Sequence, residues 1–281
     1  VLKFKNLCYN LSMKFLILIP VGFIVGTVGT LIGAGGGFLL MPFMMLYFSN
    51  SSPKDLTAIS MIAIFFNSLS GTYAYMKMKR VEIKTAIIFS LITIPGSIVG
   101  TIVTNFLDRK KYNLAFGIFL ILIVIFLLFF KKVEQGDNKN SFLTKTCFVK
   151  DSSGNEYNFS YNLLVGLVIS FFVGFLSPIF GIGGGVLHVP FMIKLLCFPP
   201  HIATATSHFV LMVMSFVSVL THIFSKVDRF VLLNSLMIII GIIPGAQLGA
   251  KLSKKVHGNF LLYFLSFALF VVALRILFLK G

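Results

Sequence analysis

Long apolar runs without a charged residue are the feature that most limits what this chain can fold into. Residues 114–130 contain no charged side chain, and residues 260–274 contain none either. Each run is close to the roughly 20 residues that a helix needs to cross a bilayer. Charged residues make up 11% of the chain, whereas a soluble domain carries about a quarter. We therefore predict an all-α, polytopic protein that is integral to a lipid bilayer.

Polar breaks divide the chain into eight principal apolar blocks. The blocks are 13–48, 56–76, 84–104, 112–130, 161–198, 203–224, 230–250 and 259–279. The interval between the fourth and fifth blocks is polar and rich in Gly, Ser, Asn and Asp, which is typical of a solvated loop. The predicted organisation is a first transmembrane repeat at 1–130, a polar inter-repeat loop at 131–160 and a second transmembrane repeat at 161–281.

The two halves of the chain resemble each other. Gly33-Ala34-Gly35-Gly36-Gly37 followed by Pro42 recurs 148 positions later as Gly181-Ile182-Gly183-Gly184-Gly185 followed by Pro190. At nearly the same offset, Pro53, Ser60 and Pro95-Gly96 recur as Pro200, Ser207 and Pro244-Gly245. A near-constant offset over several landmarks indicates internal duplication. We expect two homologous repeats of about four transmembrane segments each.

The first block of each repeat is too long for one crossing and is interrupted by its glycine cluster. The backbone freedom of glycine and the later proline both oppose one continuous helix. We expect two half-helices that meet at a break facing protein or a watery cavity. One net crossing per long block, the favoured arrangement, makes the halves parallel and places the N-terminus and the loop 77–84 on one side. A fifth crossing per half would instead give an inverted repeat.

The paired glycine breaks are the predicted substrate site. The N-terminus of a half-helix carries unpaired N–H groups and partial positive charge, which together attract anions. Residues 16–47 and 163–191 contain no acidic or basic side chain apart from His188. The predicted substrate-binding residues are Gly33, Gly35, Gly36, Gly37, Ser60, Gly181, Gly183, Gly184, Gly185, His188, Ser207 and His208. The alternative is that these glycines only allow helices to pack closely.

Histidine can change its protonation state near neutral pH, so His188 and His208 can carry a coupling proton or donate a hydrogen bond to an anion. A neutral histidine bonded between helices is the alternative for both. We expect His201 and His222, which lie near block ends, to be interfacial. The segments Gly96–Gly100 and Gly245–Gly249 are small-xxx-small motifs that predict close helix contacts.

Several kinds of chemistry lack their sequence signature. The three cysteines are far apart without a CxxC spacing, and no HExxH is present, so we predict no metal site, no cofactor and no catalytic residue. The net charge of +16 lies mainly in the polar breaks, where it orients helices, so we predict no nucleic-acid partner. The expected partners are the lipid bilayer and a small anionic substrate, and the oligomeric state stays open.

The basic residues before the first block resemble the start of a signal peptide. The block runs directly into the repeated glycine segment, however, so we expect it to be retained in the mature protein.

The twin units Gly33–Pro42 and Gly181–Pro190, together with the later PGxxxG elements, resemble the TauE/SafE sulfite exporter family, also called the toluene-sulfonate uptake permease family. The resemblance covers nearly the whole chain. It implies transport of sulfur-containing anions such as sulfite, thiosulfate or organosulfonates without ATP hydrolysis, and it leaves substrate and direction open. Coupling to protons is compatible with it.

Two alternatives remain. A passive anion channel would share the same site. An intramembrane enzyme or sensor would need a nucleophile–base pair, and Ser207 and His208 do not supply one because adjacent helix residues point in different directions.

Overall fold

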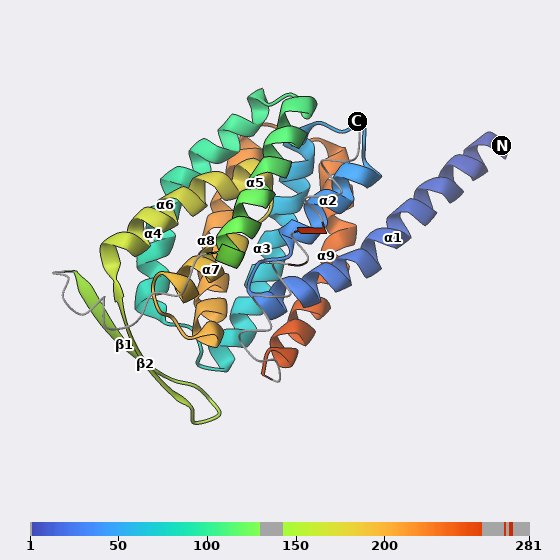
Figure 1. Cartoon of the computed structure of the whole chain (residues 1–281). Coiled ribbons are helices and arrows are strands. Elements are labelled where there is room, and N and C mark those ends of the chain that lie inside the picture. Colours follow the sequence, from blue (N-terminus) through green and yellow to red (C-terminus); the bar gives the residue numbers. More distant parts are fainter. Residues whose placement is uncertain (1, 130–142, 255–266, 268–269, 272–281) are drawn as a thin grey trace.

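The computed structural model describes residues 2–129, 143–254, 267, 270 and 271, and it is mostly helical (Figure 1). The elements of the first half are α1 (Leu2–Ile32), α2 (Gly37–Tyr47), α3 (Pro53–Lys77), α4 (Ile83–Val103), the short 3-10 helix η1 (Thr104–Phe106) and α5 (Arg109–Phe129). Those of the second half are β1 (Thr144–Lys150), β2 (Glu156–Asn162), α6 (Leu163–Phe180), α7 (Gly185–Lys194), α8 (Pro200–Phe224) and α9 (Arg229–Leu252). The predicted block at 259–279 lies outside the described residues, apart from the last three named.

Within the described residues, five helical stretches are long and apolar enough to cross a membrane, namely α3, α4 with η1, α6, α8 and α9. Local capping fixes where several of them begin. Ser52 accepts a hydrogen bond from the Asp55 backbone N–H, with Pro53 at the first position of α3. Asn162 caps α6 in the same way. The helices therefore start at polar breaks that the sequence itself specifies.

A β-hairpin occupies part of the predicted inter-repeat loop, so the prediction of an all-α chain with a solvated loop at 131–160 is wrong for residues 144–160. β1 and β2 pair antiparallel, with Cys147 opposite Phe159. Alternate residues of the two strands, among them Val149 and Tyr161, are buried on one face, as the period of two in a strand requires. The hairpin projects from the ends of α4 and α6 (Figure 1).

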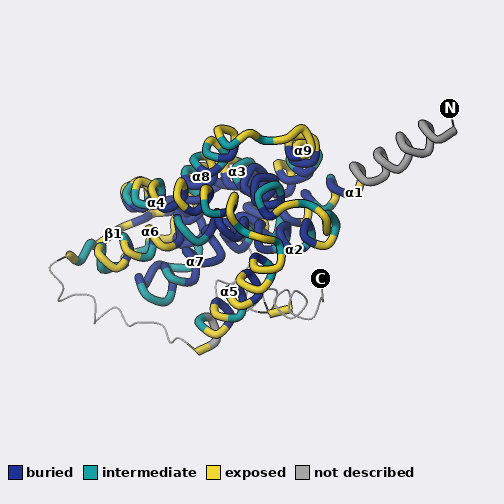
Figure 2. The backbone as a smooth tube through the Cα atoms, turned by 90° about the horizontal axis from the view of Figure 1, so that it is seen from above, coloured by how far each residue is buried: buried dark blue, intermediate teal, exposed yellow. Residues whose placement is uncertain are grey.

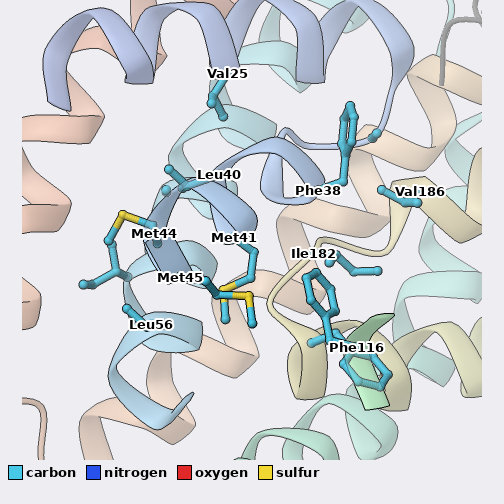
Figure 3. Close-up of a cluster of buried hydrophobic side chains, with 14 of the residues drawn as sticks. Val25, Phe38, Leu40, Met41, Met44, Met45, Leu56, Phe116, Ile182 and Val186 are labelled. Atoms are coloured by element: carbon cyan, nitrogen blue, oxygen red, sulfur yellow. The ribbon is translucent and has the colours of Figure 1, made fainter. Parts of the chain in front are cut away.

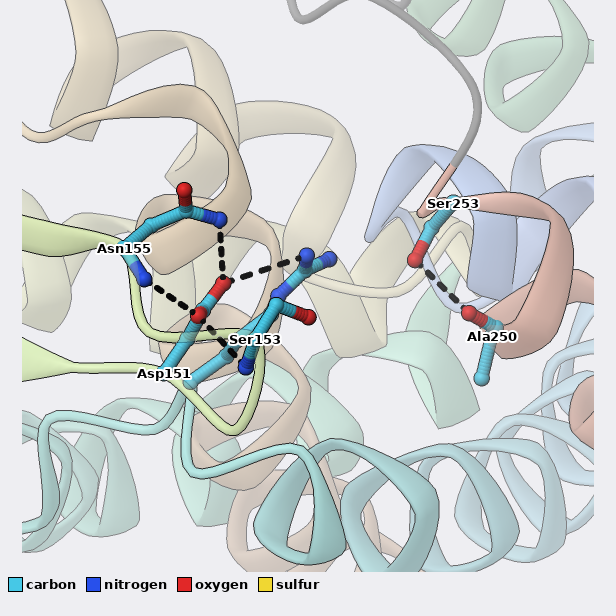
Figure 4. A network of polar contacts seen from close by, with 6 residues as sticks. Asp151, Ser153, Asn155, Ala250 and Ser253 are labelled. Carbon is cyan, nitrogen blue, oxygen red and sulfur yellow. Dashed lines mark hydrogen bonds and ion pairs between the residues drawn. The ribbon is translucent and has the colours of Figure 1, made fainter.

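A buried ion pair fastens the turn of the hairpin to the loop after α3 (Figure 4). Asp151 accepts hydrogen bonds from Ser153, from the backbone and side chain of Asn155, and from the Arg80 guanidinium at 3.4 Å. The Ser152 N–H also donates to the Met78 carbonyl. Burial raises the pKa of the Asp151 carboxyl, but the hydrogen bonds from Asn155 and Ser153 and the charge of Arg80 outweigh it, and the net pKa lies below its usual value.

Among the five candidate spans α3 is the most buried, and Figure 2 shows it near the centre of the molecule beside α8, with exposed residues on the outer helices. Around this centre, α1 packs against α9 and α4 packs against α6. Glycines make both contacts close: Gly245 lies on the backbone of Phe23, and Gly96 lies on the backbone of Phe171 and Phe175. The prediction that the two small-xxx-small segments form close helix contacts is confirmed.

The direction of the helices follows from these contacts. Gly241, Gly245 and Gly249 lie in order on Ile19, Phe23 and Thr27, so α1 and α9 run parallel. Phe48, just after α2, packs against Phe230 at the start of α9, with ring centroids 5.0 Å apart. The chain therefore enters the helix bundle along α1 and returns along α2 to the same side of the bundle.

The second long block reverses in the same way. Phe198, just after α7, packs against Phe159 and Tyr161 of β2, and β2 leads directly into α6. The expectation of one net crossing per long block is therefore wrong, because each glycine break turns the chain back instead of letting it continue. The N-terminal end of α1 and the loop 77–84 consequently lie on opposite sides of the helix bundle, not on one side.

Candidate functional site

The two glycine breaks turn the chain by means of left-handed backbone. Gly33, Gly35 and Gly36 have φ angles of 85°, 75° and 79°, and Gly181 and Gly183 have φ angles of 61° and 77°. Only glycine adopts this region without a steric cost from Cβ. The glycine clusters therefore supply the tight reversals that connect α1 to α2 and α6 to α7.

The two breaks lie directly against each other. A Cβ atom on Gly185, the first residue of α7, would collide with the carbonyl oxygen of Gly33. A Cβ atom on Gly37, the first residue of α2, would collide with the backbone of Ile182. Thus α7 begins next to the break between α1 and α2, and α2 begins next to the break between α6 and α7. Two helix N-termini, with their unpaired N–H groups and partial positive charge, meet at one place inside the bundle.

Two buried serines hold the breaks in a reciprocal manner. The Ser60 hydroxyl of α3 donates to the Gly181 carbonyl. The Ser207 hydroxyl of α8 donates to the Gly33 carbonyl at 3.5 Å, which is long for a hydrogen bond. Each serine therefore supports the break in the opposite half of the chain, and both side chains are fully buried.

Apolar side chains close the space around the breaks. Ile64 and Leu211 cover Gly35 and Gly183, with methyl carbons 3.3–3.4 Å from where a Cβ would stand. Phe38, Ile182 and Val186 pack together on the other side (Figure 3). A small cavity remains, without room for a water molecule. It is lined by Val173, Gly184, His188, Ser207, Val210, Leu211 and Met214. The structure thus brings the two breaks into direct contact, with apolar side chains packed around them.

His188 lies on α7 beside the second break. Its Nε2 is 3.1 Å from the Ser170 hydroxyl, and its ring packs edge-on against Phe89 with centroids 5.5 Å apart. It lines the small cavity together with Gly184 and Ser207. This histidine is therefore next to the junction of the breaks, although its ring faces α4 and α6.

His208 faces away from the junction, toward α3. Its ring packs against Gly71 and edge-on against Tyr75, with centroids 5.4 Å apart. The Tyr75 hydroxyl donates to the Thr30 carbonyl at 2.7 Å, and the Thr30 hydroxyl donates to the Asn67 side chain at 3.0 Å. Within the described part of the chain, His208 Nε2 and Asn67 Nδ2 have no hydrogen-bond partner. His208, Tyr75, Thr30 and Asn67 therefore form a buried polar cluster that reaches from α8 to a position three residues before the first break.

Two members of this cluster, Thr30 and Tyr75, are not singled out by the sequence. Thr30 precedes Gly33 by three positions, which is the one available signal, whereas nothing in the sequence distinguishes Tyr75 from the other aromatic residues. His222, expected to be interfacial, is 1% exposed near the end of α8. Among the described side chains, no group of three or more His, Cys, Asp or Glu could hold a metal ion.

A family model and several known proteins match this chain over nearly its whole length. The family model described as "Sulfite exporter TauE/SafE" matches residues 18–276. The probable membrane transporter protein YunE of Bacillus subtilis is 34% identical, over 95% of this chain and 98% of its own length. A probable membrane transporter protein of Methanocaldococcus jannaschii is 29% identical over the same shares. No solved structure matches the chain significantly.

Proposed function

Because this chain belongs to the sulfite exporter TauE/SafE family and is an integral multi-pass membrane protein, we propose that it is a secondary transporter. Its substrates are small sulfur-containing anions such as sulfite, thiosulfate or organosulfonates. The observation that carries the proposal is the contact between two interrupted helices, in which Gly185 meets Gly33 and Gly37 meets Ile182. Paired interrupted helices are the usual place of a transporter's substrate site.

Backbone N–H groups bind the substrate in this mechanism. The first N–H groups of α2 and α7 have no intrahelical partner, and both helix dipoles present partial positive charge to the junction. An oxyanion enters when Ile64 and Leu211 move apart. Ser60 and Ser207 then exchange a glycine carbonyl for a substrate oxygen as acceptor. No fixed cation is needed, so the bound anion is held weakly enough to leave on the other side.

Two inverted repeats, each with a re-entrant helix pair, supply the alternating access. The parallel pairing of α1 with α9 and of α4 with α6 supports this arrangement, since each pair joins helices from both halves. Rocking of the α1–α9 pair against the α4–α6 pair would open the junction first to one side of the membrane and then to the other.

Flux measurements in proteoliposomes test the proposal. We expect uptake of at least one of radiolabelled sulfite, thiosulfate or taurine, competed by unlabelled substrate but not by chloride. Gly185→Val should abolish uptake, because its side chain collides with the first break, whereas Gly154→Asn at the open hairpin turn should transport normally. Ser207→Ala is the milder variant, which keeps the backbone packing and should reduce uptake. Absence of flux for all three sulfur compounds, from monodisperse protein, would refute the proposal.

We further propose that His208 carries a coupling proton. The unpaired Nε2 of His208 lies in the polar cluster that ends at Thr30. Protonation of this nitrogen would therefore place a positive charge in a cluster that lies next to the first break. His208→Gln should abolish accumulation driven by a pH gradient and retain exchange of labelled for unlabelled substrate. If no ion gradient drives accumulation in the unmodified protein, it is a passive anion channel with the same site.

A further inference from the structure

An apolar groove lies on the side of the bundle, between α5, α6 and α7. Its volume is about 520 Å³. Its lining is wholly apolar and includes Leu122 and Phe126 of α5, Phe172 and Val173 of α6, and Phe191 of α7. Among them Leu122 and Phe172 are more than half exposed, so the groove opens toward the bilayer and not toward the interior.

A lysine stands at one end of this groove. The Lys194 ammonium lies 5.8 Å from the centroid of the Phe126 ring, and Phe126 contacts Phe191 with centroids 4.5 Å apart. Lys194 is in the last turn of α7, whose ten residues span about 15 Å. That length is half of the roughly 30 Å hydrocarbon core. The lysine is therefore at headgroup depth on the hairpin side, and the groove extends from it toward the middle of the membrane.

The chemistry of the groove favours a lipid chain as its occupant. An acyl chain is narrow and wholly apolar, as the lining of the groove is, and the Lys194 ammonium lies beside the lining residue Phe126. A cation beside the headgroup position selects lipids with a negative charge.

We propose that this groove binds one acyl chain of an anionic phospholipid, with the headgroup beside Lys194. Val173 lines both the groove and the small cavity next to His188. The bound lipid therefore contacts the outer face of a side chain whose inner face borders the junction of the glycine breaks. The site is independent of the substrate proposed above, and it exists whether or not the protein transports an anion.

The absence of tryptophan from the chain makes a direct test available. Phe172→Trp places a single fluorophore in the groove, and Phe171→Trp places one on the preceding residue of α6, which is 44% exposed but does not line the groove. Each variant is reconstituted with phosphatidylglycerol or phosphatidylcholine that carries brominated acyl chains, and quenching is measured as a function of the brominated fraction.

For Phe172→Trp we expect brominated phosphatidylglycerol to compete for the site about fivefold better than brominated phosphatidylcholine, as one basic residue near the membrane surface allows. Phe171→Trp should show no headgroup preference. Adding Lys194→Gln should remove the preference at position 172, and adding Lys84→Gln, an exposed lysine at the start of α4, should preserve it. Equal quenching by both lipids, persistence of the preference without Lys194, or absence of quenching because another helix covers the groove would each overturn the proposal.

Discussion

Ser60 and Ser207 hold the two glycine breaks, and their hydrogen bonds are not equivalent. Ser60 donates directly to the Gly181 carbonyl, whereas Ser207 reaches the Gly33 carbonyl only at 3.5 Å. The repeat pattern alone was enough to single out both residues and the glycines they hold. The partners of His208 were not predictable, because Thr30 and Tyr75 meet it only through the packing of three helices distant in sequence.

Removal of the Ser60 hydroxyl should therefore destabilise the protein more than removal of the Ser207 hydroxyl. Ser60→Ala leaves a buried carbonyl without its partner, which costs about 1–3 kcal/mol, and Ser207→Ala should cost about 1 kcal/mol less. Thermal unfolding midpoints in detergent measure both. Ser68→Ala is the matched control, since this buried serine of α3 bonds to a carbonyl of its own helix. Equal shifts for Ser60→Ala and Ser68→Ala would contradict the assignment.

At the scale of elements, the hairpin of β1 and β2 behaves as a clamp between the two halves of the chain. Its turn is recognisable in Asp151-Ser152-Ser153-Gly154-Asn155, flanked by runs rich in Thr, Val, Phe and Tyr, which is a hairpin signal. The abundance of polar residues outweighed that signal and predicted a loop. The anchor of the clamp was not predictable, because Arg80 and Asp151 are separated by 71 positions and meet only in the fold.

The Asp151 carboxylate should govern how firmly the hairpin is attached. Hydrogen bonds to a charged group contribute about 1.5–3 kcal/mol each, so Asp151→Asn should speed amide hydrogen exchange in residues 144–162 by about tenfold or more at pH 6. Lys150→Gln, which removes an exposed ion pair with Glu156, should change the exchange little. A hairpin that exchanges at the same rate in both variants would argue against the clamp.

The same carboxylate sets the pH range of the clamp. Since the pKa of Asp151 is lowered in the folded protein, its contribution is fully present above the ordinary carboxyl value of about 4 and is lost only as the pH falls below it. Hydrogen exchange in residues 144–162, corrected for intrinsic rates, should thus be unchanged from pH 7 to pH 5 and should rise below about pH 4. Loss of protection already near pH 6 would point to a different titrating group.

At the scale of the whole molecule, the two halves exchange packing partners. α1 packs on α9, and α4 packs on α6. The number and length of most helices could be predicted from apolar runs, because crossing a bilayer fixes both. Their directions could not, since a glycine cluster such as Gly33–Gly37 is equally compatible with a chain that continues and with one that turns back.

This exchange of partners predicts that neither half is stable alone. Residues 1–136 and 137–281, expressed together as two chains with an affinity tag on one, should co-purify in mild detergent as one complex. Each half expressed separately should aggregate, since α1 and α6 lack their close-packed neighbours. Gly245→Leu in the second chain should weaken the complex by separating α9 from α1. A monodisperse single half would disprove the expectation.

The hairpin has a practical consequence for imaging this small protein. It stands outside the membrane-spanning helices (Figure 1), carries the exposed Phe148 near its middle, and is fixed at its turn by Asp151 and Arg80. An antibody fragment that recognises this surface would keep a constant angle to the helices. It would thereby add the extra mass outside the detergent micelle that particle alignment in electron cryomicroscopy requires, and it would leave the lipid-facing sides and the glycine junction untouched.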